Sequence, residues 1–315
     1  PTNPHSLSSN VILPIYVDSK GYVWIGAGDD GLNRFTRSTK QVTHFRHNPD
    51  KSNSIISDEV LSIDEDQEGI LWLGTAEGLE RFDPSLSSFR HYQRNPDDPT
   101  SLSANRVFVV YVDRQNNVWV GTSAGLDRLD RETGTFIHYT PQVGNPNSLS
   151  GPSVNTIMED SQGYLWVGTF DNGLNRFDPE TQTFTRFLHN PKDKTTLSNA
   201  SILSIHEDAK GRIWIGTAGG GLNLYHPDTD SFTYYLEKDG LPNGVVYGIL
   251  EDARGNLWMS TNFGISRFNP ESKTFRNFDA GDGIQSNEFN SSAYAKGRNG
   301  ELYFGGINGL TVFRP

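Results

Sequence analysis

One short pattern recurs along the whole chain and limits what it can fold into. The clearest copy, residues 160–177, reads DSQGYLWVGTFDNGLNRF. Its start, Asp160 to Gly163, predicts a tight turn, because Asp bonds its own backbone and Gly accepts a positive φ. The apolar run around Trp166 and the segment ending at Phe177 predict two strands joined by a second turn. A lone hairpin is barely stable in water, so these units must pack on copies of themselves.

An aromatic residue at the centre of each copy marks the period of the repeat, which lies between 44 and 48 residues. A period in the forties with several short strands per repeat indicates a β-propeller, and no long 3.6-residue pattern supports a helical solenoid instead. We therefore predict an all-β fold, a seven-bladed propeller forming a single domain over residues 1–315. The seven anchors are Trp24, Trp72, Trp119, Trp166, Trp214, Trp258 and Tyr303.

Each blade is expected to hold four antiparallel strands. In the second blade these are residues 60–65, 70–75, 79–83 and 88–92, and continuously apolar inner strands are predicted at 107–112 and 245–250. The chain stops just after a third strand, whereas residues 1–10 match the loop that elsewhere follows a fourth strand. We therefore expect a last blade of three strands, completed by a strand upstream of Pro1 in a longer polypeptide. Without that strand, the blade leaves an open sheet edge that another chain could pair with.

Composition excludes several classes of function. With 27 Lys and Arg against 38 Asp and Glu, the net charge of −11 argues against nucleic acid or an anionic membrane as a partner. The absence of cysteine excludes disulfides, thiol chemistry and zinc–thiolate sites. No signal peptide and no apolar run long enough to insert into a bilayer is present.

Histidines and repeated aspartates give no sign of catalysis. Of the eight histidines, only His5 falls near the predicted channel mouth, so a histidine base there has little support. The D-x-x-G pair recurs from blade to blade at the start of the hairpin, which a turn explains better than a metal site does. We expect no catalytic residue, no metal and no cofactor.

The repeats from Val154 to Phe177 and from Ile202 to Tyr225, each preceded by a loop such as NPNSLS, resemble the two-component regulator propeller repeat. The resemblance covers essentially the whole chain and implies the periplasmic sensor region of a bacterial hybrid histidine kinase or diguanylate cyclase, often one that responds to oligosaccharides. The rest of the receptor chain would then be a partner, and a homodimer is left open. Departures from the repeat fall on structural positions: Asn117, Ser260, Gly297 and Tyr303.

A ligand site is expected where the loops entering the inner strands and those joining second to third strands gather around the channel. Amides and carboxylates beside aromatic rings would suit a sugar or another small polar ligand. Many of the Asn and Asp residues have a simpler role in capping turns, but turns do not require Arg106, Tyr247 or Phe263. Two further aromatics, Phe108 and Phe289, belong to the same prediction. The predicted ligand-binding residues are Asp29, Asp30, Arg106, Phe170, Asp171, Asn172, Tyr247, Asn262, Phe263, Asn290 and Asn308.

Three functions remain open at this stage. The first is a ligand-binding sensor without catalysis, which we expect. The second is a propeller-fold polysaccharide or streptogramin-type lyase, for which Arg106 and Tyr247 could supply a charge-neutralising cation and a base. The third is a platform for a protein partner, since propellers offer broad faces.

Overall fold

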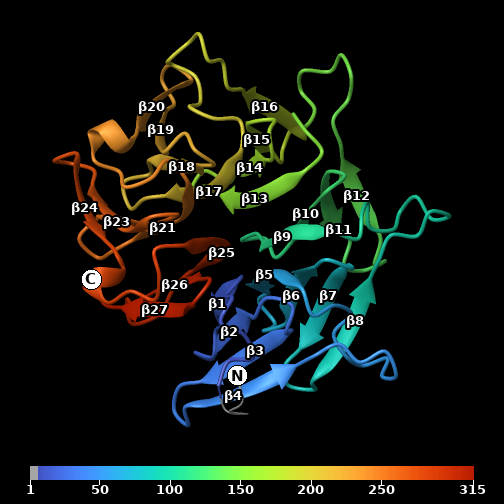
Figure 1. The fold of residues 1–315 in the computed structure, drawn as a ribbon. Helices are drawn as coiled ribbons and strands as arrows, with labels where there is room; N and C mark the ends of the chain where they lie inside the picture. Colours follow the sequence, from blue (N-terminus) through green and yellow to red (C-terminus); the bar gives the residue numbers. More distant parts are fainter. Residues whose placement is uncertain (1–5) are drawn as a thin grey trace.

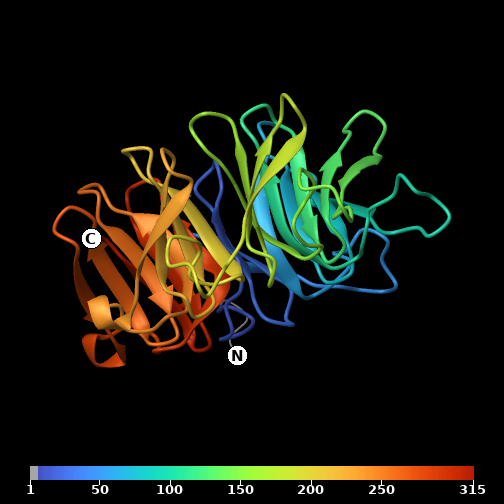
Figure 2. The ribbon, with the colours of Figure 1, turned by 90° about the horizontal axis from the view of Figure 1, so that it is seen from above.

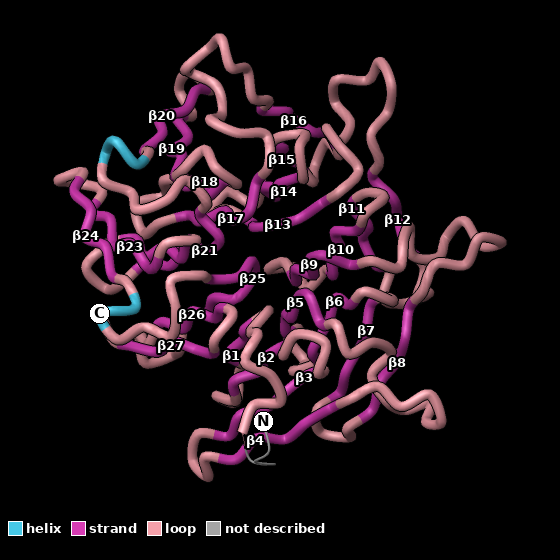
Figure 3. The backbone as a smooth tube through the Cα atoms, in the orientation of Figure 1, coloured by secondary structure: helices cyan, strands magenta, loops and turns pink. Residues whose placement is uncertain are grey.

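The computed structural model describes residues 6–315 as seven antiparallel sheets arranged around a central axis (Figure 1). Six sheets have four strands and the seventh has three, which confirms the predicted seven-bladed propeller with an incomplete last blade. Figure 2 shows the ring turned by 90°, with loops at both ends of the blades. In the part of the chain that the structure describes, helix is confined to two short 3-10 segments, η1 (Glu237–Asp239) and η2 (Ala280–Asp282), visible in Figure 3.

The strands follow the repeat in order from the axis outward. The inner strands are β1 (Ile15–Val17), β5 (Val60–Glu65), β9 (Val107–Val112), β13 (Val154–Glu159), β17 (Ile202–Glu207), β21 (Val246–Glu251) and β25 (Phe289–Lys296). The second strands are β2 (Val23–Gly26), β6 (Leu71–Thr75), β10 (Val118–Thr122), β14 (Leu165–Thr169), β18 (Ile213–Thr217), β22 (Leu257–Thr261) and β26 (Leu302–Gly306).

Beyond these lie the third and outer strands. The third strands are β3 (Leu32–Thr36), β7 (Leu79–Asp83), β11 (Leu126–Leu129), β15 (Leu174–Asp178), β19 (Leu222–His226), β23 (Gly264–Asn269) and β27 (Gly309–Phe313). The outer strands are β4 (Gln41–Phe45), β8 (Ser88–Tyr92), β12 (Phe136–Tyr139), β16 (Thr183–Phe187), β20 (Ser231–Tyr235) and β24 (Thr274–Phe278). The predicted ranges of the second blade and of β9 agree with these to within one residue, and β21 begins and ends one residue later than predicted.

Six blades have an Asp six residues before the Trp, and this spacing has a reason that sequence analysis missed. In blade 4, Asp160 accepts hydrogen bonds from the backbone N–H groups of Gln162 and Tyr164, both at 3.0 Å, so it caps the turn as predicted. Its other oxygen accepts the indole N–H of Trp166 at 2.8 Å. Both side chains are buried, so the carboxylate satisfies a donor that would otherwise be unpaired inside the protein. Five other blades repeat this bond at 2.8–2.9 Å.

The seventh blade lacks both the Asp and the Trp that form this hydrogen bond in the other six blades. Gly297 stands where the other blades have Asp, and Tyr303 stands where they have Trp. Tyr303 has no indole N–H to satisfy, and its hydroxyl bonds instead with Arg37 of the first blade. The paired departure indicates that the carboxylate is required chiefly by the indole.

Glutamates at the ends of four inner strands join neighbouring blades. Glu207 of blade 5 accepts the backbone N–H of Ser161 at 2.7 Å and its hydroxyl at 2.6 Å, across the boundary with blade 4. Glu65 holds Ser19 of blade 1 in the same way. Glu159 and Glu251 each accept one backbone N–H of the preceding blade. The Glu-Asp pair of the repeat therefore has two functions, one between blades and one within a blade.

Buried polar residues of the third strands hold the loops between blades. Glu80 has no exposed surface; it accepts a hydrogen bond from the backbone N–H of Ile56 and bonds with His91 Nδ1, both at 2.6 Å. Asp127 accepts the N–H of Ser103 at 2.9 Å and bonds with His138 Nδ1 at 2.7 Å. These histidines are part of the scaffold, because each one joins an outer strand to a buried carboxylate of the neighbouring third strand.

The Asp127–His138 pair predicts a pH dependence of stability. The hydrogen bond with Asp127 raises the pKa of His138 above its ordinary value. Since the folded-state pKa exceeds the unfolded one, this stabilisation is fully present below about pH 6.5 and is lost as the pH rises through the folded pKa. We expect the free energy of unfolding of the wild type, minus that of His138→Gln, to be larger at pH 5.5 than at pH 8.5 in urea titrations. A difference that does not change with pH would contradict this assignment.

The first and seventh blades close the ring within the described residues. Ile12 donates its backbone N–H to the carbonyl of Gly306 at 2.9 Å, and Gly309 donates to the carbonyl of Asn10 at 2.7 Å. Ile12 and Ile15 pack with Tyr303 in a shared apolar cluster. Among residues 6–315, no fourth strand lies beside the outer edge of β27. In residues 6–315 no helix has the length and apolar character needed to cross a membrane.

Candidate functional site

One end of the ring gathers the segments entering the inner strands and the turns between second and third strands. We call this end the mouth face and the opposite end, which carries the D-x-x-G turns, the turn face. Backbone hydrogen bonds bind the two sets of segments together across blades. Gly173 donates to the carbonyl of Ala200 and Gly264 to that of Asn287, both at 2.7 Å. Glycine is required at both positions, since φ is +81° and +87° and a Cβ would lie within 2.4 Å of a carbonyl oxygen.

The largest group of predicted residues on the mouth face spans blades 2 to 4. Arg106 donates to Glu59 of the preceding blade at 2.6 and 3.4 Å, and its guanidinium lies 5.7 Å from the ring centre of Phe108. Phe108 in turn lies 6.5 Å from Phe170, which is 43% exposed. An accessible aromatic surface therefore stands beside a fixed guanidinium–carboxylate pair. Such a surface can stack on an apolar ligand face while the charged pair bonds its hydroxyls.

A second group lies on blade 6. The hydroxyl of Tyr247 donates to Asn262 Oδ1 at 3.0 Å, which leaves the Asn262 amide N–H donors without a bond to another described residue. Next to Asn262, the ring of Phe263 is 54% exposed. This group again combines an exposed ring with orientated polar groups. Arg106 and Tyr247, which the lyase hypothesis would use together, stand on blades 3 and 6.

The remaining predicted residues make contacts that position the mouth-face loops. Asn290 donates to the carbonyl of Ile12 at 2.8 Å and so helps to join blade 7 to blade 1. Asp30 forms an ion pair with Arg46 at 2.9 Å, and Asp171 accepts a hydrogen bond from the Ser201 hydroxyl. Asn308 donates to the carbonyl of Gln285 at 3.1 Å, and Asn172 lies against Gly151. Asp29 is exposed.

Of the residues predicted at the mouth, Phe289 lies in the core and His5 is not described. Phe289 is only 2% exposed and packs against Phe304, so its inclusion among the ligand-facing aromatics was wrong: it belongs to the core. His5 lies outside the described residues. Sequence analysis also missed Glu59, the partner of Arg106, because the two lie 47 residues apart on different blades. Their equal distance from the start of adjacent inner strands is the signal that could have paired them.

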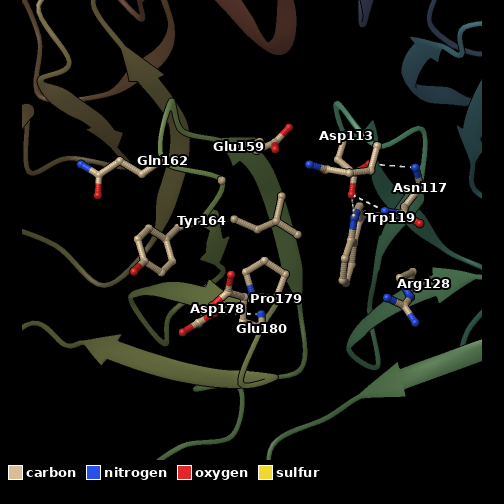
Figure 4. Close-up of a pocket in the computed structure, with 13 residues that line it drawn as sticks. Asp113, Asn117, Trp119, Arg128, Glu159, Gln162, Tyr164, Asp178, Pro179 and Glu180 are labelled. Carbon is tan, nitrogen blue, oxygen red and sulfur yellow. Dashed lines mark hydrogen bonds between the residues drawn. The ribbon is translucent and has the colours of Figure 1, made fainter.

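The turn face carries a cavity of about 450 Å³ between blades 3 and 4 (Figure 4). Blade 3 contributes Trp119 with Arg128 5.7 Å from its ring centre, together with Asn117, which donates to Asp113 at 2.8 Å. Blade 4 contributes Tyr164 and the carboxylates of Glu159, Asp178 and Glu180. No residue of this cavity was among the predicted ligand-binding residues. Within residues 6–315 no group of three or more His, Asp or Glu side chains has an arrangement suited to a metal ion.

Comparison with known proteins agrees with the repeat pattern. The two component regulator propeller profile matches residues 6–29, 101–124, 148–171, 196–219 and 240–263. The extracellular domain of a putative hybrid two-component system from B. thetaiotaomicron is 31% identical, with a TM-score of 0.82 over 100% of this chain and 40% of that one. No curated protein sequence matches the chain.

More distant structures share the fold. The extracellular domain of a second putative hybrid two-component system from B. thetaiotaomicron is 22% identical, with a TM-score of 0.53 over 100% of this chain and 48% of that one. Virginiamycin B lyase from Staphylococcus aureus is 17% identical, with a TM-score of 0.71 over 98% of this chain and 96% of that one. The chain thus spans less than half the length of the two extracellular domains.

The fold, the five matched segments and the similarity along the full chain to an extracellular domain of a hybrid two-component system agree with one another. The chain is a seven-bladed propeller that carries two-component regulator propeller repeats.

Proposed function

We propose that this propeller is the non-catalytic, ligand-sensing part of the periplasmic region of a bacterial receptor, and that it binds an oligosaccharide or another small polar ligand at its mouth face. The observation that carries the proposal is the 31% identity, over the whole chain, with an extracellular domain of a hybrid two-component system. The rest of the receptor chain, including its kinase or cyclase output domain, would be the partner that transmits the signal.

The mouth face supports this proposal through its chemistry. Phe170 and Phe263 are large apolar side chains, 43% and 54% exposed, and their rings can stack on the apolar face of a ligand. Each stands beside polar groups already held in position, the Arg106–Glu59 pair and the Tyr247–Asn262 bond. Preorganised groups lose little conformational freedom when a ligand binds.

The proposal is tested by screening a set of plant and host oligosaccharides by thermal shift, followed by mass spectrometry of the mixtures. A shift with unchanged oligosaccharide supports a sensor. A shift accompanied by cleavage would assign the domain to the lyases, and no shift with any member of the set would contradict oligosaccharide binding.

Variants at the exposed rings locate the site. We expect Phe170→Ala and Phe263→Ala each to weaken binding of the shifting oligosaccharide about fivefold, since a stacked ring contributes about 1 kcal/mol. Leu86→Ala is the matched control, because Leu86 is 74% exposed but lies in a turn-face loop. Calorimetric titration measures the three dissociation constants. Equal affinities for all three variants would place the ligand elsewhere.

A further inference from the structure

The free edge of the seventh blade lies beside an apolar cavity between blades 7 and 1. The cavity has a volume of about 500 Å³, and Tyr303, Leu310 and Val312 of blade 7 line one side of it. Apolar side chains of β2, β3 and β4, among them Phe35 and Val42, line the other side. Val312 is 46% exposed although it lies within a sheet of the propeller. The cavity and the edge of β27 together form a groove, which we call the blade 7 groove.

The six complete blades show what fills the equivalent place. The last aromatic residue of each outer strand lies against the tryptophan of its own blade, with ring centres 5.5–6.2 Å apart. In blade 1, for example, Phe45 lies 5.7 Å from Trp24 and 5.1 Å from Phe82 of the next blade. Among residues 6–315, blade 7 has no outer strand, and its cavity lies between Tyr303 and Phe35, where such a ring would be.

The strand register determines which residues a strand docked on β27 would carry. In blade 6, Phe275 and Phe278 of the outer strand pair with two apolar residues of β23 that are three positions apart. Phe313 and Leu310 hold the same two positions of β27, as their pairing with β26 shows. A docked strand would therefore place one ring beside Phe313, which packs 4.8 Å from Trp258 of blade 6. A second ring, three residues later, would point to the opposite face and enter the cavity beside Leu310.

The first described residues run along the same groove. Leu7 lines the cavity, and Ser8 donates its backbone N–H to Asn33 at 3.0 Å. Ser103, in the loop that leads from β8 into β9, donates to Asp127 in the same way at 2.9 Å. The segment at Leu7 thus has the place of a loop that elsewhere follows an outer strand.

We propose that the blade 7 groove binds an extended segment of the receptor polypeptide from the N-terminal side of residues 1–315, which pairs antiparallel with β27 and carries two aromatic residues three positions apart. This inference rests on the proposed place of the propeller in a longer receptor, and the chain covers only 40% of the related extracellular domain. The docked ring would remove the exposed Val312 surface from water and give Tyr303 the ring partner that each tryptophan has.

A peptide with the sequence of residues 272–279, SKTFRNFD, is the probe, because it contains the outer strand of blade 6. Fluorescence anisotropy of the labelled peptide measures binding to residues 1–315, up to about 1 mM, the effective concentration of a tethered strand. We expect binding, and we expect alanine in place of both phenylalanines to weaken it at least about tenfold, since each ring buries apolar surface. No binding of SKTFRNFD, or equal binding of the two peptides, would contradict the proposal.

A variant of β27 locates the peptide. Leu310→Lys puts a charge against the docked ring and should weaken binding of SKTFRNFD at least about tenfold. Ile137→Lys is the matched control, because Ile137 is 44% exposed on β12, the outermost strand of a complete blade, and its replacement should leave binding unchanged. Circular dichroism shows whether both variants are folded. Equal affinities for the two folded variants would place the peptide elsewhere.

A longer receptor fragment identifies the segment that fills the groove. With the preceding natural sequence of about 20 residues, enough for one strand and its loop, the fragment should bind SKTFRNFD at least about tenfold more weakly and melt at a higher temperature. Unchanged peptide binding and melting would overturn the assignment of the occupant. So would a dimer of residues 1–315 that the peptide dissociates, seen by light scattering, since a second copy would then fill the groove. No oligosaccharide is involved, so these outcomes are independent of binding at the mouth face.

Discussion

Replacement of Asp160 with alanine is expected to lower the free energy of unfolding by about 3–5 kcal/mol. The change leaves three donors without their acceptor: the backbone N–H groups of Gln162 and Tyr164 and the buried indole N–H of Trp166. Each unsatisfied buried donor costs about 1–3 kcal/mol, and the two backbone groups, which are partly accessible, cost least. Urea denaturation followed by tryptophan fluorescence measures the loss.

Asp178→Ala is the matched control for this prediction. Asp178 also accepts two backbone N–H groups in a turn, from Glu180 at 2.9 Å and Thr181 at 3.4 Å, but it bonds no indole and is only half-buried. Its loss should cost less than about 1 kcal/mol. A double-mutant cycle with Trp166→Phe, which removes the indole N–H, should show that the two changes are not additive. Equal costs for Asp160→Ala and Asp178→Ala would show that the carboxylate serves only the turn.

The second large effect is expected at His91. Replacement of His91 with leucine removes the 2.6 Å partner of Glu80, a carboxylate with no exposed surface whose pKa is raised by burial. A buried charge left without its partner costs about 3–5 kcal/mol. The second change, Glu80→Gln in the same protein, should recover most of this loss, since a neutral amide can still accept the N–H of Ile56.

The repeat itself supports that recovery. Asn175 of blade 4 stands at the position of Glu80 and accepts the equivalent loop N–H, from Ser150, at 2.9 Å. His226→Leu is the matched control, because His226 bonds only the hydroxyl of Thr233 at an exposed site and should cost less than about 0.5 kcal/mol. If the double variant were no more stable than His91→Leu alone, the cost would come from lost packing rather than from the unpaired carboxylate.

The scaffold could be predicted from sequence because local residue patterns determine it. The spacing of Trp24 to Tyr303 gave the number of blades, and the repeated turns gave the strand ends to within about one residue where strands were predicted individually. The three-stranded last blade followed from where the strands of that repeat stop. Each of these features repeats, so one blade can be interpreted from another.

Contacts between blades could not be predicted in the same way. Arg106 was identified but its partner Glu59 was not, and Phe289 was placed at the mouth although it is buried in the core. The cavity on the turn face depends on which side chains from two blades face the same groove. Asn117 was named as a departure from the repeat, but counting from Asp113 places Asn116, with a φ of +68°, at the position of the turn glycine.

Amide hydrogen exchange, compared between the free protein and its complex with the oligosaccharide that raises the melting temperature most, is the most direct test of the proposed sensing role. We predict slower exchange on the mouth face, in residues 104–108, 169–173, 245–248 and 261–264, and unchanged exchange in the D-x-x-G turns. Protection confined to those turns, or to the open edge of β27, would contradict recognition at the mouth face.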